Sequence, residues 1–199
     1  MKLEIGSGNN PTNGFEHLDV NPNAPHVEYV GDIRALITKD YDINFYPDFQ
    51  QLHTAQFEGI RCIHVLEHIQ WIYQNTFLRL LHDLLEPGGI LYLETPDLKW
   101  IMMSYSKNRK KKRFPTTEHP ELKDDKDLLQ FYQWVNFKLY SGCSPGDFHH
   151  CCYDKDFLTH VLLLTGFESI SIKTRGGTLS GIVRKPKSVD NKDDEFFKP

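Results

Sequence analysis

The chain has 199 residues and a net charge of −4, with 39% apolar and 13% aromatic residues. This composition predicts one folded domain with a hydrophobic core and excludes a disordered chain. The negative charge argues against a general nucleic-acid binder. No apolar run approaches the roughly 20 residues that a membrane-spanning helix needs, and the N-terminus carries no signal-peptide pattern.

Strand-like and helix-like runs alternate along the chain, which predicts an α/β fold with a largely parallel sheet. Strands are expected at residues 3–5, 16–20, 27–30, 60–65 and 90–94, and a helix at 70–85 that Pro87-Gly88-Gly89 stops. A second helix, capped by Asp154 and ended by Gly166, precedes a closing antiparallel pair at 167–173 and 179–183.

Residues 1–185 are expected to form the single domain, with residues 100–153 as a long insertion and residues 186–199 as a charged tail that frays. Within the insertion, residues 107–138 read as a basic run, a polar loop and a helix. The basic run "RKKKR" is followed directly by acidic residues that largely cancel its field, so a nucleic-acid partner is disfavoured.

The cysteines do not form a secreted disulfide framework. Cys62 lies in an apolar strand-like run, Cys143 stands alone, and Cys151 and Cys152 are adjacent. This spacing favours reduced thiols and a cytoplasmic protein.

The stretch "LEIGSGNNPTNGFEHLDVNP" combines a strand, a Gly6-Ser7-Gly8 turn and a second strand that ends in Asp19. Gly6 and Gly8 permit a sharp turn close to a ligand. Pro11 stands where the dinucleotide fingerprint has its third glycine, and the short link to Asp19 leaves little room for a crossover helix. A pyrophosphate is therefore disfavoured, and a ligand with a ribose and a base is favoured.

Three acidic residues indicate the chemistry of this ligand. Asp19 ends the second strand and is placed to accept both hydroxyls of a ribose. Asp32 follows the third strand, where it can accept from an exocyclic amine such as that of adenine. Glu4 lies inside the first strand and needs a partner, for which the amino group of the ligand is one candidate. A ribose, an adenine and an amino acid together describe S-adenosylmethionine.

Several stretches resemble class I S-adenosylmethionine-dependent methyltransferases: "LEIGSG", "HLDVNP", "GDI", "IRCIHVLEHI", "LLEPGGILYLETPDL" and "LTGFESI". The resemblance covers roughly residues 2–185. It implies a Rossmann-like fold, with a mostly parallel sheet, an antiparallel C-terminal hairpin and helices on both faces. It also implies that the cofactor pocket is lined by Glu4, Gly6, Gly8, Asp19, Asp32 and His64, with Val20 and Ile33 packed on the adenine.

The short link before Asp19 resembles a compact subgroup of this family that is often associated with surface polysaccharide biosynthesis. "LYSGCSPGDFHHCCYDKDFLTHVLLLTGF" resembles the subgroup's later segment and aligns His149 with its histidine, although Cys143 replaces the usual glutamine. The resemblance implies O-methylation of a sugar hydroxyl on a glycan or glycolipid precursor. The insertion at 100–153 would form the acceptor-side lid, and its many aromatic rings suit stacking on sugars.

Methyl transfer to a hydroxyl needs a base with a pKa near neutrality, which favours histidine. His149 is the first candidate and His68 the second. Asp97, just past the fifth strand, is placed to orient His149, bind a metal or hold the sugar. The alternatives are that His149 only pins its loop and that Glu67 and His68 cap the following helix and tie the fourth strand to the cofactor pocket.

The run "HHCC" at residues 149–152 does not predict a zinc site, because neighbours on a strand point to opposite sides and no second pair stands at finger spacing. The sequence leaves open the possibility that aspartates and histidines near the cleft hold a single Mg²⁺. The alternative functions are methylation of RNA or of a small metabolite, and a cofactor-binding module without activity.

Overall fold

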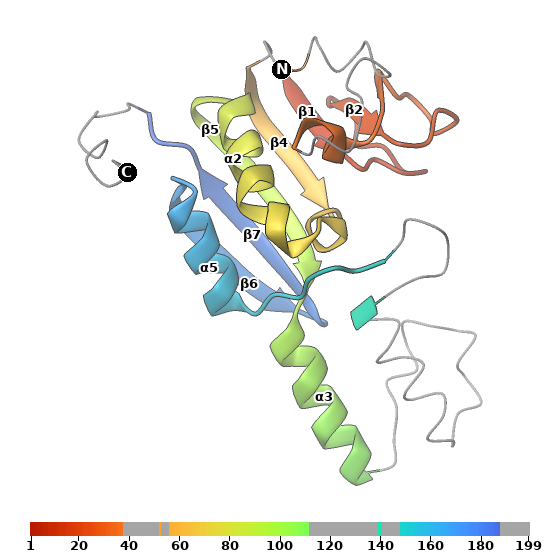
Figure 1. The fold of residues 1–199 in the computed structure, drawn as a ribbon, viewed down its shortest axis with the longest axis vertical. Helices are drawn as coiled ribbons and strands as arrows, with labels where there is room; N and C mark the ends of the chain where they lie inside the picture. Colours follow the sequence, from red (N-terminus) through yellow and green to blue (C-terminus); the bar gives the residue numbers. More distant parts are fainter. Residues whose placement is uncertain (38–51, 53–55, 112–138, 141–147, 188–199) are drawn as a thin grey trace.

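The computed structural model describes residues 1–37, 52, 56–111, 139–140 and 148–187. They form a seven-stranded sheet in the order β3-β2-β1-β4-β5-β7-β6 (Figure 1). The parallel part comprises β1 (Lys2–Ile5), β2 (Glu16–Asp19), β3 (Tyr29–Val30), β4 (Phe57–Ile63) and β5 (Leu85–Pro96). β7 (Thr178–Arg184) runs antiparallel to both β5 and β6 (Glu168–Arg175). The predicted Rossmann-like fold, with its closing antiparallel pair, is confirmed.

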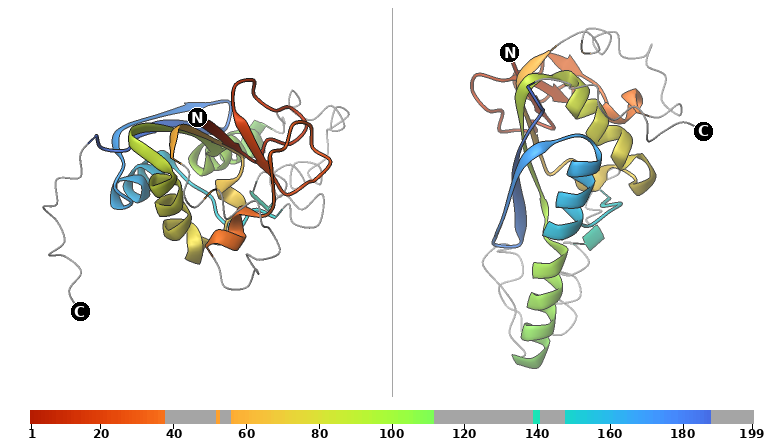
Figure 2. Two further views of the ribbon diagram at one scale, coloured as in Figure 1. Left: turned by 90° about the horizontal axis from the view of Figure 1, so that it is seen from above. Right: turned by 90° about the vertical axis from the view of Figure 1, so that its left-hand side faces the viewer.

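Two helices, α2 (Gln74–Leu84) and α5 (Lys155–Leu164), lie side by side over one face of the sheet (Figures 1 and 2). Apolar residues at helical spacing bury one side of α2, among them Phe77 and Leu81. Asp154 caps α5, as predicted, by accepting from the amide of Phe157 at 2.8 Å. Short 3-10 helices connect the strands at Ile33–Leu36 (η1), Leu66–His68 (η3) and Trp71–Tyr73 (η4).

The boundary between α2 and β5 differs from the prediction. The helix ends at Leu84 and the strand begins at Leu85, so Pro87-Gly88-Gly89 lies inside the strand. The pairing with β4 passes from Leu85 directly to Ile90, which makes the intervening residues a bulge. A Cβ on Gly89 would lie 2.9 Å from the carbonyl oxygen of Glu86, so only glycine fits this bulge.

The predicted insertion at residues 100–153 begins with a helix that the sequence analysis missed. This helix, α3 (Leu98–Lys111), extends beyond the end of the sheet (Figure 1). Asp97 caps it by accepting from the amide of Trp100 at 3.0 Å. Residues 112–138 and 141–147, with most of the predicted lid, lie outside the described residues, as does the tail from residue 188.

Three cysteines, Cys62, Cys151 and Cys152, are free thiols in the structure. Burial is the largest cause that raises the pKa of the Cys152 thiol to about 11, and the neighbouring Cys151 and Glu67 contribute to the same shift. Cys152 is therefore a neutral thiol near pH 7. Of the helices that the structure describes, none combines the length and the apolar character needed to cross a membrane.

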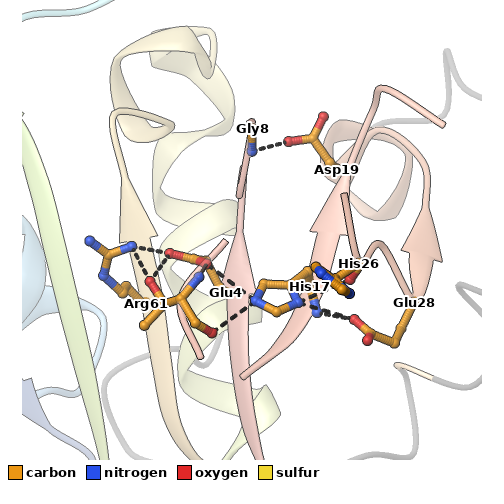
Figure 3. A network of polar contacts seen from close by, with 8 residues as sticks. Glu4, Gly8, His17, Asp19, His26, Glu28 and Arg61 are labelled. Atoms are coloured by element: carbon orange, nitrogen blue, oxygen red, sulfur yellow. Dashed lines mark hydrogen bonds and ion pairs between the residues drawn. The ribbon is translucent and has the colours of Figure 1, made fainter. Parts of the chain in front are cut away.

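The carboxylate of Glu4, buried inside β1, fastens the link between β1 and β2 to the sheet (Figure 3). His17 on β2 and Arg61 on β4 lie directly opposite Glu4 in the strand register. Arg61 donates to one carboxylate oxygen, and the amide of Thr12 donates to the other at 2.7 Å. The hydroxyl of Thr12 donates at 2.8 Å, and His17 Nε2 lies 3.5 Å from the carboxylate. These contacts fix the position of the link, a role that a crossover helix has in other folds of this type.

We expect Glu4→Gln to lower the free energy of unfolding by about 3 kcal/mol, because it leaves Arg61 without its buried counter-charge. Urea unfolding at neutral pH measures this loss. Glu58→Gln is the matched control, since Glu58 pairs with Lys2 across the same two strands at 3.9 Å with both side chains about half exposed. The control should lose less than about 1 kcal/mol. Equal losses in the two variants would contradict the role given to Glu4.

A second expectation concerns His82 near the end of α2, whose ring packs edge-on against Phe167 with centroids 5.2 Å apart. Burial lowers the pKa of His82, while a hydrogen bond to Asp83 opposes this shift. The unfolded chain therefore binds this proton more tightly than the folded protein does. Its contribution to stability is complete above the unfolded pKa of about 6.5 and is lost as the pH falls toward the folded pKa.

Urea midpoints at about pH 7.5 and pH 5.5 measure this linkage in the wild type and in His82→Phe. Phenylalanine keeps a ring against Phe167 and does not titrate. The decrease in stability on acidification should be smaller in the variant. An equal decrease in both proteins would assign the pH dependence to other groups.

Candidate active site

A cavity of about 460 Å³ opens at the carboxyl ends of β1, β2, β3 and β4. β1 lies between β2 and β4, so the cavity sits where the direction of strand addition reverses, which is where open α/β sheets bind ligands. Its volume falls within the roughly 300–1,000 Å³ typical of small-molecule sites. It is lined by Ile5, Gly6, Leu18, Asp19, Val20, Gly31, Asp32, Ile33, Arg34, His64, Val65, His68 and Ile69.

Most residues predicted to hold the cofactor line this cavity, and two do not. Gly6, Asp19, Val20, Asp32, Ile33 and His64 are in the lining. Gly8 lies outside the lining and donates its amide to Asp19 at 2.8 Å. Glu4 is also outside the lining, and its carboxylate is bonded to Thr12 and Arg61.

The Gly-rich turn is held by the acid of the next strand. Gly6 has φ +71°, and a Cβ there would lie 2.6 Å from Val65, so the turn requires glycine. Asp19 accepts from the amides of Gly8 and Asn21, each at 2.8 Å. A carboxylate has about four lone-pair positions, so Asp19 keeps the capacity to accept from a ligand. The buried hydroxyl of Ser7 has no hydrogen-bond partner among the described residues.

The carboxylate of Asp32 is paired within the cavity wall. Arg34 lies two residues further along, and its Nε lies 2.9 Å from each carboxylate oxygen. The amide of Arg34 also donates to Asp32 at 2.9 Å, because η1 turns the chain back at this point. Sequence analysis missed Arg34, since no pattern in "GDIRAL" indicates that its side chain returns to the preceding acid.

Glu67 is wholly buried beneath the cavity residue His64. Nδ1 of His64 lies 2.9 Å from Glu67 Oε1. The interpretation that Glu67 and His68 cap the following helix is wrong, because both residues lie within η3 and the helices that follow begin without a side-chain cap. Their proximity to the pocket follows instead from the turn of η3 at the end of β4.

The structure brings together His68 and His149, the two histidines that were predicted from the sequence as candidate bases. The rings of His68 and His149 meet edge to face with centroids 4.9 Å apart. Nδ1 of His68 lies 3.1 Å from the carbonyl oxygen of Phe148, and the amide of His150 donates to the carbonyl of Glu67 at 2.7 Å. These contacts join two segments that are distant in sequence, and they place His149 beside the cavity residue His68.

Asp97 occupies a different position from the histidines. It is buried, caps α3 and forms a parallel bridge with Tyr153. The amide of Leu98 donates to the carbonyl of Tyr153 at 2.7 Å, which reinforces this junction. Asp97 is not among the residues that line the cavity.

Solved structures of similar fold include methyltransferases. One is a SAM dependent methyltransferase from Archaeoglobus fulgidus, at 13% identity and TM-score 0.53, covering 92% of this chain and 85% of that one. Another is the DhpI–SAH complex, at 14% identity and TM-score 0.54, covering 94% and 77%. A third is an O-methyltransferase family protein from Burkholderia thailandensis, at 9% identity and TM-score 0.53. That comparison covers 94% of this chain, which spans about half (51%) of the relative's length.

These identities establish the fold alone, and a search of curated protein sequences found no match. The family model described as a methyltransferase domain matches residues 3–172, which is most of the chain. The fold, the Gly-rich turn and the cavity at the strand ends agree with this match. The chain therefore belongs to the methyltransferase-domain family, among the class I S-adenosylmethionine-dependent methyltransferases.

Proposed function

We propose that this methyltransferase acts on a sugar hydroxyl of a glycan or glycolipid precursor. The observation that carries the cofactor assignment is the cavity at the strand ends, with the carboxylates of Asp19 and Asp32 in its wall. In this proposal Asp19 accepts from the ribose hydroxyls and Asp32 from the adenine amine. Val20 and Ile33, which also line the cavity, pack against the adenine ring.

The residues around the cavity fit S-adenosylmethionine. Gly6 lets the backbone approach the ligand closely, and the buried hydroxyl of Ser7 in the same turn needs a polar partner. When bound, the cofactor supplies an electrophilic methyl group on a sulfonium. The protein has to align the acceptor with this methyl group and remove a proton from a hydroxyl that is a weak nucleophile.

The acceptor side is assigned to the two histidines. His68 lines the cavity, and the ring of His149, from the later segment, contacts the ring of His68. This contact supports the proposal that the acceptor meets the cofactor beside the two histidines. In this proposal His149 activates the hydroxyl and His68 supports it. Asp97, which joins α3 to Tyr153, positions the segment that carries His149.

Two exposed aromatic residues support a carbohydrate acceptor. Tyr140 and Phe148 are 59% and 51% exposed. Their backbone carbonyl oxygens lie within hydrogen-bonding distance of the histidines, with Tyr140 accepting from the amide of His149 at 2.9 Å and Phe148 lying 3.1 Å from His68 Nδ1. Aromatic faces stack well on the apolar faces of sugar rings, so exposed aromatic residues whose backbone contacts the two histidines support a sugar acceptor.

The test is methyl transfer from isotopically labelled S-adenosylmethionine to a panel of glycans and glycolipid precursors, followed by mass spectrometry. RNA and small metabolites form separate arms. Methylation of a sugar hydroxyl is the expected result. Transfer only to RNA or a metabolite would overturn the sugar acceptor, and cofactor binding without transfer to any member of the panel would overturn the proposed activity.

Asp19→Ala should weaken S-adenosylmethionine binding by about 2–3 kcal/mol, or roughly 30- to 150-fold, because a buried charged acceptor is lost. Isothermal titration calorimetry measures the change. Glu16→Gln is the control, since Glu16 starts the same strand at the far end from the cavity and bonds to Tyr29. Unchanged affinity in Asp19→Ala would remove this carboxylate from the site.

His149→Ala should lose most of the turnover while its affinity for S-adenosylmethionine stays near that of the wild type. His149→Gln should fold and remain slow, because an amide can hydrogen-bond but does not take the proton. His150→Ala, which alters the exposed neighbouring ring, should keep full kcat. Near-normal kcat with a normal pH profile in the glutamine variant would make His149 a positioning residue only.

A further inference from the structure

Glu67, His68 and His149 form a compact group at the acceptor side of the cavity. One carboxylate oxygen and one ring nitrogen of each histidine all lie within 4.8 Å of one another. η3 supplies Glu67 and His68, and the segment that begins at Phe148 supplies His149. A carboxylate and two imidazoles that converge from separate segments are the donor set of a mononuclear metal centre.

The burial of Glu67 supports this reading. Its side chain is 1% exposed, and His64 contacts only Oε1. Oε2 is buried and has no hydrogen-bond partner among the residues described. An uncompensated carboxylate oxygen in the interior is costly, so a native protein is expected to provide it with a partner. A cation bound by the neighbouring histidines would supply the missing partner.

The contacts around His68 match those of a metal-binding histidine. Nδ1 lies 3.1 Å from the carbonyl oxygen of Phe148, and a carbonyl can only accept. The proton of the neutral ring is therefore held on Nδ1, which leaves Nε2 with its lone pair. Metal-bound histidines almost always donate their second nitrogen to a carbonyl or carboxylate in this way.

The geometry requires only a small contraction to bind an ion. Three atoms spaced at most 4.8 Å apart have a common point within about 2.8 Å of each, whereas zinc bonds to nitrogen and oxygen are about 2.0–2.2 Å. Side-chain rotations that move each ligand atom by less than about 1 Å would shorten these distances to the length of a zinc bond. Two imidazoles favour Zn²⁺, Co²⁺ or another transition metal over Mg²⁺, which prefers oxygen ligands.

We propose that Glu67, His68 and His149 bind one divalent transition-metal ion, such as Zn²⁺, beside the cofactor cavity. Only His149 comes from the "HHCC" run, and its partners lie in η3, so the site does not depend on adjacent residues of one strand chelating together. The ion joins the acceptor segment to the end of β4, and it adds to the backbone bond between His150 and Glu67.

The proposal deepens the proposed function and rests on it for its catalytic consequence. Three protein ligands leave a position open, and a sugar hydroxyl bound there loses its proton to solvent more readily than a free one. The hydroxyl oxygen then forms the bond to the methyl carbon, while the carbon–sulfur bond breaks and leaves its electron pair on sulfur. With the ion bound, His149 would act on the hydroxyl through the metal, and this role would replace the direct proton transfer given to His149 in the proposed function.

The test is metal binding by the full chain after treatment with a chelator and its removal. Titration with Co²⁺ should give visible absorption bands that saturate at about one equivalent, and Zn²⁺ should displace them. Calorimetry with Zn²⁺ gives the affinity without any cofactor or acceptor present. His149→Ala and Glu67→Gln should each weaken binding at least about tenfold.

His150→Ala is the matched control, because this exposed neighbour of His149 contributes only its backbone amide to the group. Its metal affinity should equal that of the wild type. Circular dichroism identifies any variant that fails to fold. If Glu67→Gln fails to fold, the metal affinity of His149→Ala alone tests the site. No binding at one equivalent, or equal binding in His149→Ala and the wild type, would overturn the site.

Failure of this site and failure of the proposed function are distinguishable. Methyl transfer to a sugar that persists in the presence of the chelator would overturn the catalytic role given to the ion and leave the proposed function standing. Stoichiometric metal binding that requires His149, with no transfer to any sugar, would overturn the proposed acceptor and leave the metal site standing.

Discussion

The buried carboxylate of Glu4 is the interaction on which the cofactor side of the protein depends. It lies in the middle of β1, and the register of the sheet sets His17 and Arg61 on either side of it. Burying a carboxylate is costly unless charged and polar donors surround it, and here a guanidinium, a backbone amide and a hydroxyl all donate. Because two of these donors belong to Thr12, compensating the charge also fixes the link between β1 and β2.

Fixing that link determines the shape of the cavity. In most nucleotide-binding α/β folds, a crossover helix sets the spacing between the first two strands. In this chain the link is fastened at Thr12 by Glu4 and at Gly8 by Asp19, so two carboxylates replace the helix. The Gly-rich turn is held above the strand ends, where Gly6 approaches Val65 closely. Asp19 therefore both fixes the Gly-rich turn and forms part of the cavity wall.

A second buried carboxylate organises the side of the cavity to which we assign the acceptor. Glu67 lies just beyond β4, its Oε1 lies 2.9 Å from Nδ1 of His64, and it forms a compact group with His68 and His149. Its backbone carbonyl accepts from His150, so the same residue anchors the later segment. Asp97, at the end of β5, has a structural role in capping α3 and pairing with Tyr153. The two halves of the site are thus each built around one buried acid.

The parallel order of the strands places both halves at one edge of the sheet. Gly6, Val20, His64 and Asp97 each follow directly after the last residue of β1, β2, β4 and β5. Parallel strands bring their carboxyl ends to the same side, so residues far apart in sequence converge there. The antiparallel β7 extends the sheet beyond β5 and supports Asp97, whose amide donates to Gly177.

The sequence by itself determined the alternation of strands and helices, the Gly-rich turn, the acids at the strand ends and the Asp154 cap. These features depend on local periodicity and on residues close together in the chain, which physical rules relate directly to backbone conformation. Even α3 had a local signal in Asp97 ahead of an apolar run, although the basic residues that follow obscured it.

Only the tertiary structure decided what the buried charges contact. The partners of Glu4 follow from which strands are neighbours and in which register, and neither is encoded in the periodicity of β1. Likewise, η3 and the segment of His149 meet through a contact between Phe148 and His68 across 80 residues of sequence. A local pattern identifies residues that need a partner, but the free energy of burying them is balanced by side chains that only the folded sheet brings near.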